Sequence, residues 1–274
     1  MYLCLKDSNG SFCYYISVNN QTKQIIPTSI GDIAVYINKV NSNKTPMIFL
    51  HGVYFDHELW NNQIDNIKDR TVIALDMPDH GESKNIAKNN WTLDDCARML
   101  LEILQFLKIK KVIAVGHSWG SMTIIRSTKQ KPELFEKVVL CNMPFKKAGL
   151  VRIVLMRIQY SAIIFKSFYI KQAGKSLFAK TSLNNNPKLI EEIVRPMNKL
   201  TRKEIIHTNK AVIIDAKDTS NLIKSLEVPA IAVVGSKDYV GKPPMKEVIT
   251  VRGGHISPLE DAETVTRALL KNIQ

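Results

Sequence analysis

The sequence predicts an α/β fold with a mostly parallel central sheet. Short apolar runs typical of strands alternate with helical patterns along most of the 274 residues. The later runs are continuous in Ile, Val and Leu, as expected of parallel strands that are covered on both faces. The predicted strands are residues 12–18, 33–38, 47–50, 71–75, 112–115, 138–141, 230–234 and 248–251.

The clearest helical pattern covers residues 91–107. Thr92 is a candidate N-cap with Asp95 three residues later, and apolar residues follow at helical spacing from Met99 to Leu107. A further helix is expected to begin near Ser121, directly after the predicted strand 112–115.

A helical insertion is expected where the alternation stops, from about Phe145 to about Ser220. One stripe along its first part is apolar, and Arg152, Gln159 and Lys166 lie well off that stripe. The stripe consists of Val151, Val154, Leu155, Ile158, Ala162, Phe165 and Tyr169. We predict that the stripe packs against protein over the sheet, with a lipid-binding surface as the alternative.

The formal net charge of +13 is concentrated in this insertion, where 14 Lys or Arg residues face three glutamates between Lys146 and Lys210. Three explanations stay open: attraction of anionic substrates, contact with an anionic membrane surface, and a merely solvated face. The first predicts that kcat/KM for an acidic ester falls steeply with added salt. No nucleic-acid partner is expected, since no aromatic-studded basic groove accompanies the lysines.

The four cysteines (Cys4, Cys13, Cys96 and Cys141) are scattered, without a CxxC pair or a metal-binding spacing to histidine. We expect free thiols in a cytoplasmic protein. No segment has the roughly 18 unbroken apolar residues of a membrane-spanning helix. The first residues turn polar too early for a secretory signal.

The pentapeptide Gly116-His117-Ser118-Trp119-Gly120 falls between a predicted strand and a helix. The backbone must reverse sharply there, and small residues on either side of Ser118 permit the close approach. The serine is then left at the apex, at the carboxyl edge of the sheet where α/β proteins hold their ligands. The N–H of Trp119 points toward the place where an oxyanion would form.

A serine nucleophile needs a base and a group that orients the base. Among the six histidines, His255 follows the last predicted strand, and Asp238 follows the strand before it. Both therefore lie on the same edge as Ser118, in the chain order Ser, Asp, His that accompanies this kind of turn. A second oxyanion donor is expected from the loop after strand 47–50, where the N–H of Val53 follows Gly52.

These residues resemble the α/β-hydrolase superfamily, in particular its cap-bearing branch of serine esterases, prolyl iminopeptidases, non-haem haloperoxidases, lactonases and carbon–carbon bond hydrolases. The similarity extends over nearly the whole chain. FLHGVYFDHELW (49–60) resembles the oxyanion segment, VIALDMPDHGES (72–83) the D-x-P-G-x-G-x-S loop, VGHSWG (115–120) the nucleophile elbow and GGHISPLEDAETV (253–265) the histidine loop.

The resemblance implies an α/β-hydrolase fold with a helical cap inserted before the last two strands. The core would be residues 1–145 and 221–274, and the cap residues 146–220. Ser118, Asp238 and His255 would form a catalytic triad, with the N–H groups of Val53 and Trp119 as the oxyanion hole. The expected substrate contacts are Tyr54, Phe55 and Phe145.

The sequence departs from the family pattern at two places. Asp79 stands where glycine is usual, and only 16 residues separate Asp238 from His255, so the helix between the last two strands looks shortened. Some members carry the acid after the strand that follows the nucleophile helix. That position reads Cys141-Asn142-Met143 here, which leaves Asp238 as the acid.

The expected function is hydrolysis of carboxylic esters of small or medium molecules through an acyl-enzyme on Ser118, without a metal or cofactor. A serine at this position disfavours the haloalkane dehalogenases and epoxide hydrolases of the family, which use Asp. A prolyl iminopeptidase-like aminopeptidase, a lactonase and a carbon–carbon bond hydrolase are the enzymatic alternatives. A ligand-sensing receptor on the same fold is the alternative without turnover.

Overall fold

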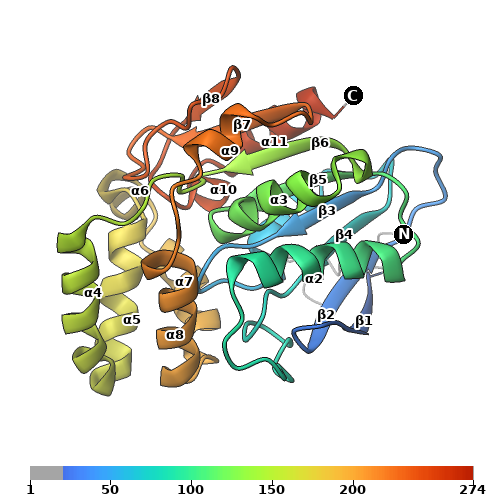
Figure 1. Cartoon of the computed structure of the whole chain (residues 1–274). Helices are drawn as coiled ribbons and strands as arrows, with labels where there is room; N and C mark the ends of the chain where they lie inside the picture. Colours follow the sequence, from blue (N-terminus) through green and yellow to red (C-terminus); the bar gives the residue numbers. More distant parts are fainter. Residues whose placement is uncertain (1–20, 274) are drawn as a thin grey trace, which may run out of the picture.

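The computed structural model describes residues 21–273, except for the side chains of residues 152, 159, 161 and 162. Its described strands form one sheet in the order β1-β2-β4-β3-β5-β6-β7-β8. From β4 to β8 every neighbouring pair is parallel, while β2 pairs antiparallel with both β4 and β1. The predicted α/β fold with a mostly parallel sheet is therefore confirmed (Figure 1).

The strands are β1 (Gln21–Pro27), β2 (Asp32–Asn38), β3 (Met47–Leu50), β4 (Val72–Leu75), β5 (Val112–His117), β6 (Phe135–Cys141), β7 (Ala230–Gly235) and β8 (Val248–Val251). The helices of the sheet layers are α1 (Asn61–Ile64), α2 (Leu93–Phe106), α3 (Trp119–Gln130), α9 (Ser220–Lys224), α10 (Ser257–Glu260) and α11 (Ala262–Asn272), with 3₁₀ turns η1 (His57–Trp60) and η2 (Pro132–Leu134).

Alternate residues of each parallel strand enter opposite halves of the core. Ile48 and Leu50 of β3 pack with α2, α3 and α9 on one face of the sheet, whereas Met47 and Phe49 pack with α1 and α11 on the other. Strands covered on both faces have no polar side, which is why their sequences are continuously apolar.

The sequence located the other seven strands but not β1. Gln21–Pro27 is an edge strand in which only Ile26 is buried, so it lacks the apolar run of the inner strands. The predicted strand 12–18 lies outside the described residues. The predicted helix is confirmed as α2, with Thr92 and Asp95 forming a reciprocal capping box.

The insertion contains helices and no strand in its described residues, as predicted. Its elements are α4 (Leu150–Ala162), the 3₁₀ turn η3 (Ile163–Phe165), α5 (Lys166–Leu177), α6 (Lys180–Asn185), α7 (Leu189–Asn198), α8 (Arg202–Asn209) and the π-helical turn η4 (Lys210–Ile214). They lie together at one end of the sheet (Figure 1). On α7, Arg195 pairs with Asp56 and Glu58 of the core.

The prediction that the apolar stripe packs against protein is wrong for most of its residues. The helix breaks at η3, so α4 and α5 run side by side instead of forming one continuous helix (Figure 1). Tyr169 turns inward, but most of the stripe faces outward. We call the exposed apolar side chains of this region the apolar surface: Leu150, Val151, Val154, Leu155, Ile158, Ile164, Phe165 and Phe168.

Cys96 and Cys141 are free, as expected, and both are buried, whereas Cys4 and Cys13 lie outside the described residues. Among the helices of residues 21–273, none has the length and apolar character needed to cross a membrane.

Candidate active site

Ser118 sits at a sharp turn between β5 and α3. Its backbone has φ +50° and ψ −108°, a conformation that residues other than glycine rarely adopt and that is typical of a strained functional turn. A Cβ on Gly120 would lie 2.3 Å from the carbonyl oxygen of Leu50, and one on Gly116 would lie 2.4 Å from the backbone nitrogen of Ser121. Both glycines are therefore required for the chain to reverse here.

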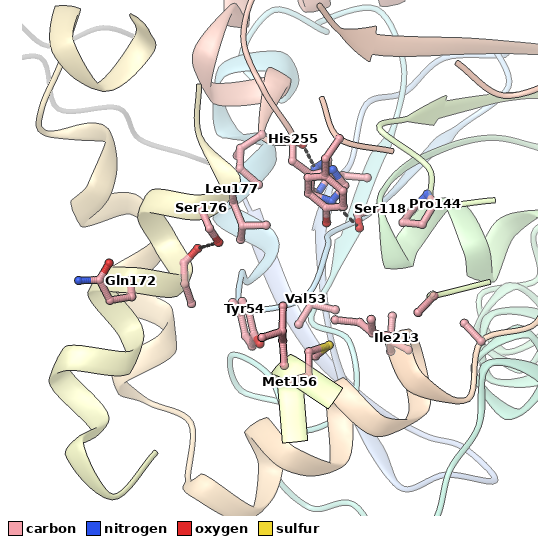
Figure 2. A pocket seen from close by; sticks show the side chains of 18 of the residues that line it. Val53, Tyr54, Ser118, Pro144, Met156, Gln172, Ser176, Leu177, Ile213 and His255 are labelled. Atoms are coloured by element: carbon pink, nitrogen blue, oxygen red, sulfur yellow. Dashed lines mark hydrogen bonds between the residues drawn. The ribbon is translucent and has the colours of Figure 1, made fainter. Parts of the chain in front are cut away.

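His255 connects Ser118 to Asp238. Its Nε2 lies 2.9 Å from Ser118 Oγ, and its Nδ1 lies 2.9 Å from Asp238 Oδ1. With the imidazole proton on Nδ1, His255 donates to Asp238 and its Nε2 accepts from the serine hydroxyl. The structure thus brings together the three side chains from the loops after β5, β7 and β8, and Figure 2 shows Ser118 and His255 pointing toward one another.

The surroundings of Asp238 favour its ionised form. Burial opposes ionisation, but hydrogen bonds from His255, from Asn142 Nδ2 (2.7 Å) and from the N–H of Val240 (3.1 Å) bring the pKa of Asp238 below its ordinary value. Sequence reasoning missed Asn142, which follows β6 on the same edge. A polar residue directly after an apolar strand, at the edge that carries Ser118, was the sequence signal that could have indicated it.

The loop that carries His255 is fixed by Glu260. One carboxylate oxygen accepts from the N–H groups of Gly254 (2.8 Å) and Ile256 (3.1 Å), and the other accepts from the N–H of Ala179 (2.8 Å) in the insertion. The N–H of His255 donates to the carbonyl of Leu177 at 2.9 Å. The insertion therefore helps to set the position of the imidazole.

The two expected oxyanion donors lie beside Ser118. Val53 follows β3 and lines the same cavity as the serine, and Trp119 is the first residue of α3. Within the described residues, neither N–H donates to another backbone group. Backbone carbonyls of the described residues therefore do not compete for either group.

Two buried histidines join the loop after β3 to the loop after β4. His51 Nε2 accepts from the N–H of Met77 at 2.8 Å, and His80 Nε2 accepts from the N–H of Tyr54 at 3.2 Å. Burial lowers the pKa of each to about 4, so both imidazoles are neutral at pH 7. These two contacts hold the backbone on either side of Val53.

The cavity above Ser118 has a volume of about 550 Å³. Its floor is the carboxyl edge of the sheet, and its roof comes from the insertion through α4, α5 and η4, including Met156, Gln172 and Ile213 (Figure 2). Most of the lining side chains are apolar. Among the described lining residues there is no Asp or Glu, whereas Lys146 is one of them.

Of the three expected substrate contacts, Tyr54 lines the cavity. Its hydroxyl donates to Asn209 Oδ1 and lies 3.0 Å from the hydroxyl of Tyr169, so it is already held in the cavity wall. Phe55 and Phe145 lie elsewhere. Phe55 packs edge-on against His117 in the core. The side chain of Phe145 is buried in the core, and its sequence neighbours Pro144 and Lys146 line the cavity instead.

Within the described residues, no group of three His, Cys, Asp or Glu side chains is arranged to hold a metal ion.

A family model described as the α/β hydrolase fold matches residues 45–160. The computed structure resembles a thermophilic esterase from Thermogutta terrifontis with a TM-score of 0.78 and 20% identity, covering 92% of this chain and 99% of that chain. The chain has the α/β-hydrolase fold.

Among curated proteins, the chain is 26% identical over 220 residues to an uncharacterized hydrolase, YugF, of Bacillus subtilis, covering 75% of this chain and 77% of that protein. It is 25% identical over 199 residues to the (E)-2-((N-methylformamido)methylene)succinate hydrolase of Acinetobacter baylyi, covering 70% and 72% of the two chains.

The structure explains why Asp79 can replace the glycine that is usual at this position of the D-x-P-G-x-G-x-S loop. The residue has φ +68°, the left-handed conformation that explains the usual glycine. Asp is among the side chains that tolerate it, and here Asp79 accepts from Trp91 Nε1 at 2.9 Å and lies 3.6 Å from His207 Nδ1. The aspartate therefore links the core to α8 of the insertion.

The second departure is also accommodated. The segment between β7 and β8 contains no helix, as the short spacing predicts. The two strands still pair in parallel, with Gly235 opposite Val251. This register places Asp238 and His255 at the same edge of the sheet, within hydrogen-bonding distance of each other.

Proposed function

We propose that this protein is a serine hydrolase that cleaves carboxylic esters of small or medium molecules. The observation that carries the proposal is the continuous chain of hydrogen bonds from Asp238 through His255 to Ser118, whose hydroxyl lines an apolar cavity of about 550 Å³. A volume of this size suits a small-molecule ligand. The esterase among the similar structures agrees with this proposal.

In the proposed mechanism, Ser118 Oγ attacks the ester carbonyl while His255 Nε2 takes the hydroxyl proton. The negative charge that develops on the carbonyl oxygen is stabilised by the N–H groups of Val53 and Trp119. The imidazolium then gives its proton to the departing alcohol, which leaves an acyl group on Ser118. Water, deprotonated by His255, attacks that acyl group, releases the carboxylic acid and restores the serine.

The aminopeptidase alternative has less support. A prolyl iminopeptidase must bind a cationic amine, for which carboxylates are the natural partners. The described cavity lining has none, and it includes Lys146. The same serine would serve in hydrolysis of lactones and in cleavage of carbon–carbon bonds, so assays have to distinguish these reactions from ester hydrolysis.

The test is hydrolysis of p-nitrophenyl acetate and butyrate by the wild type, Ser118→Ala and Ser176→Ala. Ser176 lines the same cavity, and its hydroxyl bonds to the carbonyl of Ala173, which makes it a matched control. We expect Ser118→Ala to lower kcat by about 10⁴-fold or more and Ser176→Ala to leave it nearly unchanged. Wild-type activity in Ser118→Ala would overturn the proposal.

Two further assays separate the alternatives. Strong cleavage of a proline β-naphthylamide would favour the aminopeptidase, and preferred turnover of lactones would favour a lactonase. A burst of one p-nitrophenol per protein without sustained turnover would favour the ligand-sensing receptor.

A further inference from the structure

The apolar surface is a concentrated patch rather than scattered exposure. On α4, Val151, Val154, Leu155 and Ile158 follow the i, i+3, i+4, i+7 spacing of one helical face, and that face is turned to solvent. Val151 is 73% exposed and Phe165 71% exposed. Exposed apolar groups gathered in this way mark an interaction site.

Positive charge surrounds this surface. Residues 146–186 contain eight Lys or Arg residues and no Asp or Glu. Lys171, Lys175 and Lys180 are exposed, and no described carboxylate lies within ion-pairing distance of their amino groups. By contrast, Arg195 on α7 is paired with core carboxylates. Lys171 and Lys175, on the same helix as Phe168, therefore carry positive charge that no described carboxylate neutralises.

The apolar surface is continuous with the cavity. Leu155 and Phe168 belong to both, since each is more than half exposed and each lines the space above Ser118. Their neighbours Met156 and Tyr169 line the cavity behind them. In Figure 1, α4 and α5 stand at the edge of the insertion, away from the sheet. The cavity therefore reaches the outside of the protein at the apolar surface.

We propose that α4, η3 and the first turn of α5 form a docking surface for anionic membranes. Exposed apolar side chains flanked by lysines are what the boundary between acyl chains and anionic headgroups accepts. Docking would place the mouth of the cavity against the lipid. This part of the inference rests on the proposed esterase function. The substrate is then an amphiphilic ester whose acyl chain passes from the bilayer along Leu155 and Phe168 to Ser118.

Charge also argues against a second copy of the chain as the occupant. A symmetric contact through the apolar surface would bring the unpaired lysines of both copies together, and like charges at close range repel. An anionic lipid surface instead supplies the missing negative charge.

The test is co-sedimentation of the full chain with phosphatidylcholine vesicles that either contain or lack phosphatidylserine. We expect binding to the phosphatidylserine vesicles that is about tenfold stronger and is weakened by added salt. The double variants V151S/F165S and K171Q/K175Q should each lose about tenfold in binding. Two control variants should bind like the wild type: Phe106→Ser, which changes an exposed apolar side chain on α2, and K129Q/K131Q, which removes the same charge near the end of α3.

Activity separates the two parts of the proposal. All of these variants should hydrolyse p-nitrophenyl acetate like the wild type, because none of the substituted residues lines the described cavity. A long-chain ester in phosphatidylserine vesicles should be hydrolysed about tenfold more slowly by V151S/F165S than by the wild type. Membrane binding without any esterase activity would support the docking surface but contradict the proposal that the substrate is an amphiphilic ester.

Two results would overturn the docking surface. One is a wild-type protein that sediments equally with both kinds of vesicle or with neither. The other is a dimer that V151S/F165S dissociates in sedimentation velocity, since the apolar surface would then be covered by a second copy.

Discussion

Asn142 Nδ2 donates a 2.7 Å hydrogen bond to Asp238 Oδ2, while His255 bonds to the other oxygen of the same carboxylate. The two contacts therefore hold both oxygens of the carboxylate. Asn142 is itself held by Ser257, whose hydroxyl donates to its amide oxygen. The proposed acid is therefore positioned by the loop after β6 as well as by the histidine.

Asn142→Ala should lower kcat by about tenfold with little change in KM, because a hydrogen bond to a charged group contributes about 1.5–3 kcal/mol. The pKa of Asp238 should rise toward its ordinary value, since one of the contacts that lowers it is lost. The measurement is kcat and KM for p-nitrophenyl butyrate as a function of pH. An unchanged kcat and acid limb would show that Asn142 has no positioning role.

Asp79→Gly should destabilise the protein by up to about 2 kcal/mol, although it restores the glycine usual at this position. Relief of the left-handed backbone is worth about 1 kcal/mol, but the substitution leaves the buried indole N–H of Trp91 without its acceptor, which costs about 1–3 kcal/mol. Asp79→Asn keeps an acceptor and tolerates the backbone, so it should be nearly neutral. Urea unfolding distinguishes the two, and a stabilised Asp79→Gly would contradict the argument.

Gly120→Ala should destabilise the protein by about 1–3 kcal/mol, because the new Cβ would collide with the backbone of Leu50. Gly149→Ala is the matched control. Its added Cβ would meet nothing within 4 Å, and we expect a change below about 0.5 kcal/mol. Equal unfolding midpoints in urea for the two variants would mean that the turn at Ser118 is looser than the structure indicates.

Acid should destabilise the protein through its buried histidines. Burial lowers the pKa of His51 and His80 to about 4 and that of His117 to about 3, whereas in the unfolded chain they take up protons near pH 6.5. Between these values the unfolded state binds more protons, so the free energy of unfolding falls as the pH falls. The slope is about 1.4 kcal/mol per pH unit for each histidine.

The measurement is the free energy of unfolding in urea at steps from about pH 7 to about pH 4. His80→Gln should reduce the slope by the share of one histidine. A free energy of unfolding that is flat over this range in the wild type would show that these imidazoles are not held neutral.

The local pattern of the sequence was enough for the α/β class, the parallel strands, the capped helix α2 and the edge of the sheet on which Ser118, Asp238 and His255 would lie. These features follow from periodicity and from the rule that the carboxyl ends of parallel strands share one edge. Strand β1 was not predicted, because Gln21–Pro27 is an exposed edge strand that needs no apolar run.

Only the tertiary structure decided which side of α4 faces solvent. An amphipathic pattern states that a helix has an apolar face, but it does not state what covers that face. The break at η3 separates α4 from α5, leaves Val151 and Ile158 exposed and turns Tyr169 inward. The contact between Asn142 and Asp238 was equally out of reach, because it joins residues 96 positions apart through the packing of two neighbouring strands.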